Sequence, residues 1–372
     1  MKPWYHCRFG GLPVEKFSQM RKIRPHDNRG IALLMTLAFI TLAMSLAVET
    51  NRQSRAAIES TDAFQNRILA GQMATAGIHG AMAILIQDRY DSETDHLKET
   101  WADPDRLTEA MAALSFSEGQ LEVHIADEMA RVQVNALVDF PQSRQFNPLQ
   151  QQIIERLIAS IRNANDAQSD VSATDIVNAI KDWLDNGDDD AITGLNGAES
   201  DYYETLDPPY SPRNGPMVHI GELARVKGVS AVLFEGTSKA PGLKNCMTVY
   251  GATKAADGTY SFPGRVNLNT VDQLVLSALL PPEYQDFAEA IIRYRDEAEA
   301  AVLDSKTWYQ DVPGAASLEL NPNAVSVATD VFRIRAIAVS GDIRSAISAV
   351  VERIAVTDGG GWTCRILAWE TS

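Results

Sequence analysis

An unbroken apolar run near the start of the chain limits what the first fifty residues can form. Residues 31–48 hold no charged side chain, whereas Arg29 lies just before them and Glu49 directly after. As a helix, this run of 18 residues would be about 27 Å long at ~1.5 Å per residue, about enough to cross the apolar core of a bilayer. The segment therefore predicts a membrane-spanning helix over 31–48.

The leader before this helix, residues 1–30, is basic and ends at Gly30. It carries seven Lys or Arg and two Asp or Glu residues, so we expect it to be cytoplasmic and the rest of the chain to be exported. A basic leader and a glycine directly before an apolar helix resemble a type IV prepilin-like leader. The resemblance implies cleavage between Gly30 and Ile31 by a prepilin peptidase, methylation of the new N-terminus, and retention of the helix as an anchor.

Two other interpretations of this segment remain open. Ser45-Leu46-Ala47 is an acceptable site for an ordinary signal peptidase, which would cut after Ala47. A plain single-span anchor without any cleavage would also account for the apolar run. Met20 offers a second start, and a chain that began there would keep a short basic leader.

The charge of the exported part argues against a nucleic-acid partner. The formal net charge is −16 and the first 30 residues contribute +5, so the rest of the chain carries −21. Such an acidic body repels phosphate backbones. A helix-hairpin-helix-like segment over 266–295 agrees with this, since Pro281 and Pro282 remove backbone donors from its turn and Glu283 opposes phosphate.

The sequence holds no common enzyme motif. G-x-S-x-G, H-E-x-x-H, P-loop and G-x-G-x-x-G patterns are absent, and the six histidines lie apart in the sequence. An acid/base pair of carboxylates stays open as an alternative, but we expect no enzyme. Cys246 and Cys364, the two cysteines beyond the leader, predict either a disulfide in an oxidising compartment or two buried thiols.

The hydrophobic pattern predicts an α+β fold. We expect one helix over about 31–89, with a buried stripe formed by Ala57, Thr61, Phe64, Ile68, Gly71, Thr75, Ile78, Met82 and Leu85. Alternating residues in 121–126 and 130–135 predict a β-hairpin. The period is helical over 142–330, with stripes at Leu149, Ile153, Leu157 and Ile161 and at Ile176, Ile180 and Trp183, and with capping boxes at Ser172/Asp175 and Thr270/Gln273.

The expected domain order follows from these elements. It is a leader over 1–30, a membrane helix over 31–48, a stem helix and first hairpin over 49–141, an inserted helical domain over 142–330 and closing strands over 331–372. This describes a pilin fold, a long N-terminal helix packed on an antiparallel β-sheet, with a large helical domain inserted in the sheet.

An acidic loop over 182–207 is the strongest candidate for a binding site. It holds nine Asp or Glu residues and no Lys or Arg. Oxygen ligands without His or Cys favour a hard cation, and flexible carboxylates suit Ca²⁺ better than Mg²⁺. The loop therefore predicts a structural calcium ion, and a solvated acidic loop without an ion is the alternative.

Several motifs in and after this loop resemble the K minor pseudopilins of type II secretion systems. They are Asp182-Trp183-Leu184-Asp185, Gly197-Ala198-Glu199, Tyr202-Tyr203, Pro208-Pro209-Tyr210, Asn214-Gly215-Pro216, Glu222-Leu223-Ala224-Arg225-Val226-Lys227-Gly228 and Val266-Asn267-Leu268-Asn269-Thr270, followed by a Trp-rich final strand. The resemblance implies calcium in the acidic loop. Its candidate ligands are Asp185, Asp188, Asp190, Glu199 and Asp201.

The same resemblance implies an assembly role. It predicts a protein anchored in the bacterial inner membrane with its body in the periplasm, which meets I- and J-type minor pseudopilins at the tip of the pseudopilus. Met35, the fifth residue after Gly30, stands where shaft pilins usually carry a glutamate, which fits a subunit without an earlier neighbour. The alternatives are a membrane-anchored, calcium-binding periplasmic interaction protein and a minor pilin of a related type IV pilus-like system.

Overall fold

A computed structural model describes residues 30–114, 116, 118–166, 170–187, 192–255, 257–356 and 360–372. The chain divides into two units, Met1–Asp62 and Ala63–Ser372. Helix α1 (Ile31–Asp91) contributes its first part to one unit and its second part to the other. The long helix expected over about 31–89 is thus confirmed, and the leader over 1–29 lies outside the described residues.

The first unit holds the apolar part of α1. This helix is long and apolar enough to cross a membrane near the N-terminus of the chain. Its apolar side chains between Ile31 and Val48 are exposed, and Leu33 and Phe39 are 70% and 71% accessible. Exposed leucine and phenylalanine on all sides of a helix are typical of a segment whose surroundings are lipid.

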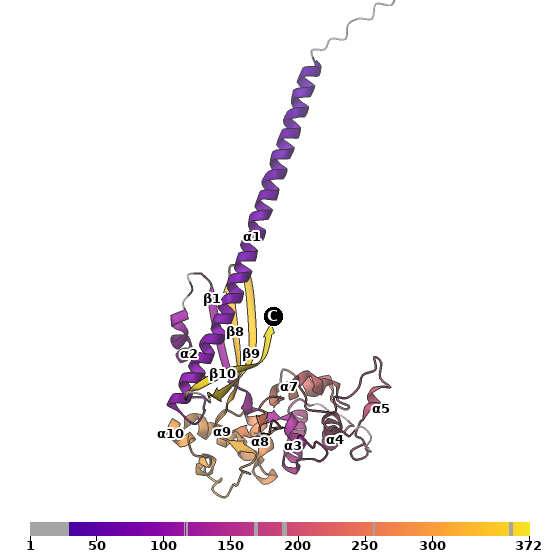
Figure 1. Cartoon of the computed structure of the whole chain (residues 1–372), viewed down its shortest axis with the longest axis vertical. Helices are drawn as coiled ribbons and strands as arrows, with labels where there is room; N and C mark the ends of the chain where they lie inside the picture. The colour runs from indigo at the N-terminus through magenta and orange to yellow at the C-terminus, as the bar shows by residue number, and fades with distance from the viewer. Residues whose placement is uncertain are drawn as a thin grey trace, which may run out of the picture. The chain divides into compact units, whose positions relative to one another are not determined.

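The second part of α1 packs on a four-stranded antiparallel sheet (Figure 1). The sheet is formed by β1 (Gln120–Asp127), β8 (Val331–Ser340), β9 (Ile343–Ala355) and β10 (Trp362–Thr371), in the spatial order β1-β8-β9-β10. The short helix α2 (Pro104–Met111) and the 3₁₀ helix η2 (Ala112–Leu114) lie between α1 and β1 in the chain. The predicted α+β class, a long helix on an antiparallel sheet, is confirmed.

The face of α1 that contacts the sheet differs from the predicted stripe. Its buried residues are Ala70, Met73, Ala74, Gly77, Ile78, Ala81 and Leu85. Of the predicted stripe only Ile78 and Leu85 are fully buried, while Phe64 is 63% exposed. Small residues dominate the real face because helix and sheet approach closely: a Cβ added to Gly77 would lie 3.0 Å from Leu121 Cδ1.

The predicted β-hairpin is wrong in its second arm. β1 pairs with β8, so residues 128–330 are inserted between two neighbouring strands. After β1 the chain forms a 3₁₀ helix, η3 (Glu128–Ala130), for which Asp127 is the N-cap and accepts a hydrogen bond from the Met129 amide. β2 (Val132–Gln133) then pairs in parallel with β3 (Met247–Thr248) and not with β1. The insertion therefore begins near 128 rather than 142.

The inserted segment is mainly helical and has a hydrophobic core of its own. Its remaining elements are η4 (Val134–Leu137), α3 (Pro148–Ala164), α4 (Ala173–Leu184), α5 (Ser200–Tyr203), η5 (Ile220–Arg225), α6 (Ala231–Glu235), α7 (Leu243–Cys246), β4 (Thr253–Lys254), β5 (Tyr260–Ser261), β6 (Val266–Asn267), α8 (Gln273–Leu279), η6 (Pro282–Phe287), α9 (Ala288–Glu297), α10 (Ala300–Leu303), η7 (Trp308–Asp311) and β7 (Val325–Ser326). The predicted stripes on α3 and α4 are buried in this core, apart from the half-buried Leu149.

Two smaller predictions have different outcomes. The helical hairpin expected over 266–295 is formed by α8 and α9, which η6 connects. The capping box expected at Thr270 does not form, because Asp272 is the N-cap of α8 and accepts a hydrogen bond from the Val275 amide.

Cys246 and Cys364 are free thiols in the described part of the chain. Cys246 is buried in the core of the insertion, and Cys364 packs against the separate core between α1 and the sheet. The disulfide is therefore not formed here, and the alternative of two free thiols is observed. Burial raises the pKa of Cys246 to about 12.

Candidate metal site

Helix α4 positions the first two acidic side chains of the site. Its N-terminus is fixed by a capping box, in which the Ser172 hydroxyl accepts from the Asp175 amide and the Asp175 carboxylate accepts from the Ser172 amide, as predicted. Its last turn carries Asp182, and Asp185 is the C-cap. Residues three apart on a helix lie on the same face, so the helix end presents both carboxylates together.

Glu199 joins these two residues from the far end of the loop. Ligand oxygens of Asp182, Asp185 and Glu199 all lie within 4.8 Å of one another. The three residues are buried, with accessible fractions of 0%, 4% and 7%. Oxygens bound to one calcium ion at roughly 2.3–2.6 Å lie no more than about 5 Å apart, so the spread of the three carboxylates is that of one coordination sphere.

Backbone amides of the loop hold Asp182 in place. Its Oδ2 accepts hydrogen bonds from the Ala198 amide at 2.8 Å and from the Thr193 amide at 3.2 Å. Gly197 allows this close approach, because an added Cβ would lie 2.1 Å from the same oxygen. Burial raises the pKa of Asp182, and the amide hydrogen bonds oppose that rise.

Two lysines from outside the acidic run contribute positive charge. Lys181 Nζ forms an ion pair with Asp185 and lies 4.0 Å from Asp182 Oδ1. Lys227 Nζ donates to the Gly197 carbonyl at 3.1 Å. Three ionised carboxylates with the Lys181 ammonium leave a net charge of about −2, which a divalent cation would neutralise; an uncompensated buried charge is costly.

Aromatic side chains from the end of α4, from the loop and from the segment just after it pack against one another. Trp183 packs edge-on against Tyr203, with ring centroids 5.1 Å apart. Tyr203 in turn lies 5.4 Å from Tyr210 and accepts a hydrogen bond from the Lys227 amide at its hydroxyl. The Trp-Leu-Asp, Tyr-Tyr and Pro-Pro-Tyr motifs of the sequence thus form one packed cluster beside the carboxylates.

The structure brings together only part of the predicted ligand set. Asp185 and Glu199 belong to the group, whereas Asp201 is exposed on α5 and is not a member of it. Asp188 and Asp190 lie outside the described residues. Sequence reasoning missed Asp182 as a member of this group and Lys181 as its neighbour. The spacing of Asp182 and Asp185 at a helix end was the signal that could have identified the pair.

The processing site lies where α1 begins. Gly30 is exposed, and Ile31 is the first residue of the helix. An added Cβ at Gly30 meets no atom within 4 Å, so packing in the described part of the chain does not account for a glycine at this position.

Comparisons with known proteins agree with one another. A family model described as "Type II secretion system (T2SS), protein K" matches residues 130–239. The type II secretion system protein K of Klebsiella pneumoniae is 29% identical over 212 residues, which are 56% of this chain and 61% of that protein, less than two thirds of its length. The protein of the same name from Aeromonas hydrophila is 26% identical over 87% of this chain and 92% of the relative.

A solved structure shares the fold. The chain resembles one in the crystal structure of the GspK-GspI-GspJ complex from the enterotoxigenic Escherichia coli type 2 secretion system, with a TM-score of 0.61 and 19% identity. The match covers 84% of this chain and 99% of that one. Family model, relatives and fold point the same way, and the chain resembles the K proteins of type II secretion systems.

Proposed function

We propose that this protein is a minor pseudopilin that starts or caps the pseudopilus of a type II secretion system together with I- and J-type minor pseudopilins. The observation that carries the proposal is the insertion of residues 128–330 between β1 and β8 of a sheet packed on a long helix. The similar fold in the GspK-GspI-GspJ complex supports these partners.

The insertion supports a place at the tip rather than in the shaft. A shaft repeats one subunit in a tightly packed helix, and about two hundred additional residues in each subunit would not fit such a repeat. Met35 supports the same place. A carboxylate in the apolar core of a bilayer is costly unless a neighbouring group neutralises it, and the first subunit has no earlier neighbour to do so.

An open groove beside α1 offers a surface for a partner's helix. It has a volume of about 680 Å³ and is lined by Ile68, Gly71 and Thr75 of α1 and by Trp369 of β10, among others. Ile68 is 45% and Trp369 is 37% exposed. These α1 residues belong to the stripe that the sequence predicted as buried; a partner's helix in the groove would bury them.

The remaining parts of the proposal concern the membrane and calcium. We infer that the apolar segment of α1 anchors the protein in the inner membrane, that the body is periplasmic, and that a prepilin peptidase cuts after Gly30. We also infer that calcium binds Asp182, Asp185 and Glu199 and stabilises the insertion, with Asp188 and Asp190 as further candidate ligands.

Co-purification tests the assembly. The full chain in mild detergent, mixed with the I- and J-type proteins of the same secretion system, should elute as a complex with one copy of this chain, as measured by light scattering. Ile68→Glu, in the groove, should weaken the complex, whereas Glu59→Gln, on the exposed surface of α1, should not. Homopolymeric fibres or no association would refute the tip role.

Thermal unfolding with calcium and with chelator tests the ion. Binding to the folded state alone adds RT ln(1 + [L]/Kd), about 2.7 kcal/mol at a hundredfold excess over Kd. Glu199→Gln should remove most of this gain, whereas Asp201→Asn, at an exposed position, should keep it. Equal melting temperatures of the wild type in calcium and in chelator would contradict a structural ion.

A further inference from the structure

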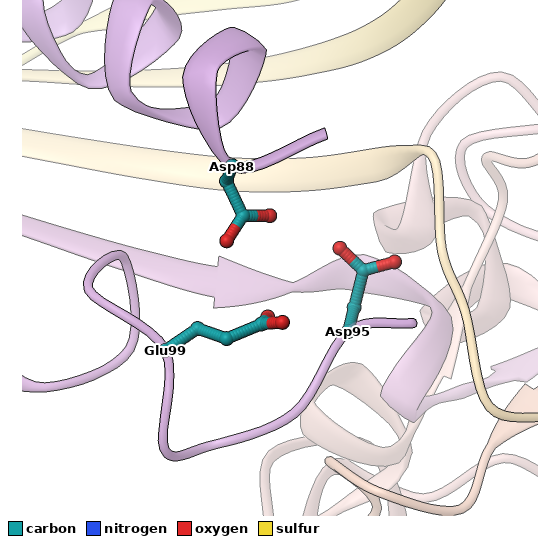
Figure 2. A group of neighbouring side chains, drawn as sticks. All are labelled: Asp88, Asp95 and Glu99. Atoms are coloured by element: carbon teal, nitrogen blue, oxygen red, sulfur yellow. The ribbon is translucent and has the colours of Figure 1, made fainter. Parts of the chain in front are cut away.

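A second group of three acidic side chains lies where α1 ends. Asp88 comes from the last turn of α1, and Asp95 and Glu99 come from the loop that follows. Figure 2 shows the three carboxylates directed toward a common point. Their ligand oxygens lie within 4.8 Å of one another, and Asp95 and Glu99 are 1% and 9% exposed.

One oxygen of Glu99 has no hydrogen-bond partner. Glu99 Oε2 accepts hydrogen bonds from Trp101 Nε1 at 2.7 Å and from the His96 amide at 3.0 Å. These two donors fix the carboxylate, whose other oxygen, Oε1, is buried and unpartnered in the described structure. A buried acceptor that is held in place without a donor costs free energy, so the position of Oε1 itself indicates a missing ligand.

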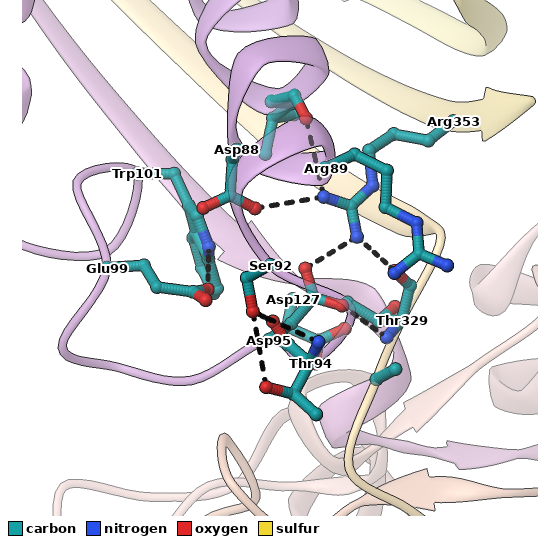
Figure 3. Close-up of polar contacts among 12 residues, drawn as sticks. Asp88, Arg89, Ser92, Thr94, Asp95, Glu99, Trp101, Asp127, Thr329 and Arg353 are labelled. Atoms are coloured by element: carbon teal, nitrogen blue, oxygen red, sulfur yellow. Dashed lines mark hydrogen bonds and ion pairs between the residues drawn. The ribbon is translucent and has the colours of Figure 1, made fainter. Parts of the chain in front are cut away.

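Arg353 of β9 holds the other two acidic residues (Figure 3). Its Nη1 lies 3.0 Å from Asp88 Oδ2, and its Nη2 lies 2.5 Å from Asp95 Oδ1. The Thr329 amide donates to Asp95 Oδ2 at 2.8 Å. The same guanidinium donates to the carbonyls of Leu85 and Thr329 and lies over the ring of Phe332. The positions of Asp88 and Asp95 are therefore fixed in the folded protein.

The charges of this group do not balance. With all three carboxylates ionised, the group and one guanidinium would carry a net charge of about −2 in a buried setting, where unpaired charge is strongly disfavoured. Burial accordingly raises the pKa of Asp88 and of Glu99 to about 7 in the absence of an ion. His96 Nε2 lies 3.8 Å from Glu99 Oε1, which is beyond hydrogen-bond distance. Asp127, which is buried next to the group in Figure 3, adds negative rather than positive charge.

We propose that Asp88, Asp95 and Glu99 bind a calcium ion, with Glu99 Oε1 as a direct ligand. Calcium accepts carboxylates at about 2.3–2.6 Å in irregular geometry, whereas magnesium, at about 2.1 Å from each oxygen, demands a near-ideal octahedron and retains most of its waters. The Asp88 side chain is 10% exposed, which leaves room for water to complete the coordination sphere.

Such an ion would strengthen the junction between the stem and the insertion. Asp88 belongs to α1, Arg353 belongs to β9, and Thr329 lies where the inserted segment returns to the sheet. Asn267 of β6 donates to the Asp95 carbonyl at 3.1 Å, so the loop that carries Asp95 also contacts the Asn-Leu-Asn motif. This site is independent of the acidic loop, and nothing in the proposed pseudopilin role requires it.

Ion stoichiometry of the full chain in detergent tests the proposal. Titration calorimetry with Ca²⁺ should show that Glu99→Gln and Asp88→Asn each lose one bound ion relative to the wild type. Glu93→Gln is the matched control, because Glu93 lies in the same loop and is exposed, and it should bind as the wild type does. In Glu199→Gln the ion at Glu99 should remain.

Terbium luminescence gives a second measurement at this site. The Trp101 indole donates a hydrogen bond to the Glu99 carboxylate, so excitation of this indole should sensitise the luminescence of a Tb³⁺ ion bound here. Excess Ca²⁺ should displace the Tb³⁺ and lower the luminescence. Glu199→Gln should keep the luminescence of Tb³⁺ at the Glu99 site, and adding Glu99→Gln to that variant should remove it. Wild-type stoichiometry in both Glu99→Gln and Asp88→Asn would overturn the proposal. The proposal would also be overturned if Glu99→Gln had a higher melting temperature than the wild type in chelator and bound as much calcium as the wild type. That result would show that protons, and not a cation, neutralise the group.

Discussion

At the scale of single residues, Gly71 and Gly77 of α1 lie in different surroundings. Nothing lies within 4 Å of an added Cβ at Gly71, whereas at Gly77 it would meet Leu121, Val123 and Ala336 at 3.0–3.1 Å. Gly77→Leu should therefore lower the free energy of unfolding by about 1–3 kcal/mol through overpacking. Gly71→Ala should raise it by about 0.5–1 kcal/mol, because glycine is a poor helix former. Urea unfolding measures both, and equal effects would contradict the close approach at Gly77.

Asp127 should give the protein a measurable pH dependence of stability. Burial raises the pKa of Asp127 from 3.8 to about 6, against the opposing hydrogen bonds from Thr270 and Asn267. The folded state therefore holds this proton more tightly than the unfolded chain does. The resulting stability is complete below about pH 4 and is lost as the pH rises through about 6.

The measurement is unfolding in chelator between pH 4 and 7. Asp127→Asn cannot titrate, so its free energy of unfolding should fall less steeply over this range than that of the wild type, whatever its absolute stability. Parallel curves for the two proteins would show that Asp127 is ionised in the folded state throughout.

Residue identity predicted an acidic, glycine-containing loop as the binding site, and the resemblance to K minor pseudopilins supplied the individual ligands. That set included Asp185 and Glu199, which the structure brings together. It missed Asp182, whose role depends on Ala198 and Thr193 amides that only the folded loop brings to it. It also missed Lys181 because charge was counted inside the loop, while this lysine reaches in from the helix before it.

At the scale of secondary structure, helix α1 and the fold class were predictable and strand pairing was not. Alternation over 130–135 correctly indicated that Val132 and Val134 are buried. Alternation reports which face of a segment is buried but not which segment it pairs with. Here β1 pairs with β8, about two hundred residues later, and the supposed second arm joins the core of the insertion instead.

An ion pair marks the point where the chain leaves the sheet. Arg333 of β8 binds Glu128 of η3 through two hydrogen bonds, Nε to Oε2 at 2.9 Å and Nη2 to Oε1 at 2.8 Å. Glu128 is 1% exposed. Burial alone would raise its pKa, but Arg333 and Arg131 lower it below the ordinary value. The pair connects the first residue of the insertion to the central part of the sheet.

Arg333→Met should lower the free energy of unfolding by about 3–5 kcal/mol, because it leaves the buried Glu128 carboxylate with less compensation. Arg335→Met is the control, since Arg335 is on the same strand and is exposed, and its effect should stay within about 0.5 kcal/mol. Calorimetric unfolding of both variants decides the matter. If the free energy of unfolding fell no more in Arg333→Met than in the control, Arg131 alone would be sufficient to compensate the charge of the Glu128 carboxylate.

At the scale of the whole molecule, the chain combines an apolar helix segment with an acidic body. The described body holds two groups of three largely buried carboxylates; Lys181 contacts the first group and Arg353 the second. Removal of ions from these two groups by a chelator should therefore lower the free energy of unfolding more than the loss of ions bound at the surface would. The two groups lie in different parts of the second unit, one in the insertion and one where α1 meets the sheet.

The apolar segment makes a prediction about the mature N-terminus. If a prepilin peptidase cuts after Gly30, the membrane-extracted protein begins at Ile31 and keeps the whole of α1. If an ordinary signal peptidase cuts after Ala47, the mature chain begins at Val48 and loses the apolar segment. The two products differ in their first residue and in whether detergent is needed to extract them.

Two variants separate these outcomes, because each replaces the small residue before one of the two possible cleavage sites, Gly30–Ile31 or Ala47–Val48. Gly30→Leu should leave the full-length precursor in the membrane, whereas Ala47→Leu should still be processed to a chain that begins at Ile31. N-terminal sequencing and intact mass, which also detects a methyl group on the new amine, read both variants. A wild-type chain that begins at Val48 would show that the helix is a cleaved signal, and an uncleaved wild type would show that it is a plain anchor. If the chain began at Val48, the stem that the tip assembly needs would have to come from residue 48 onward alone.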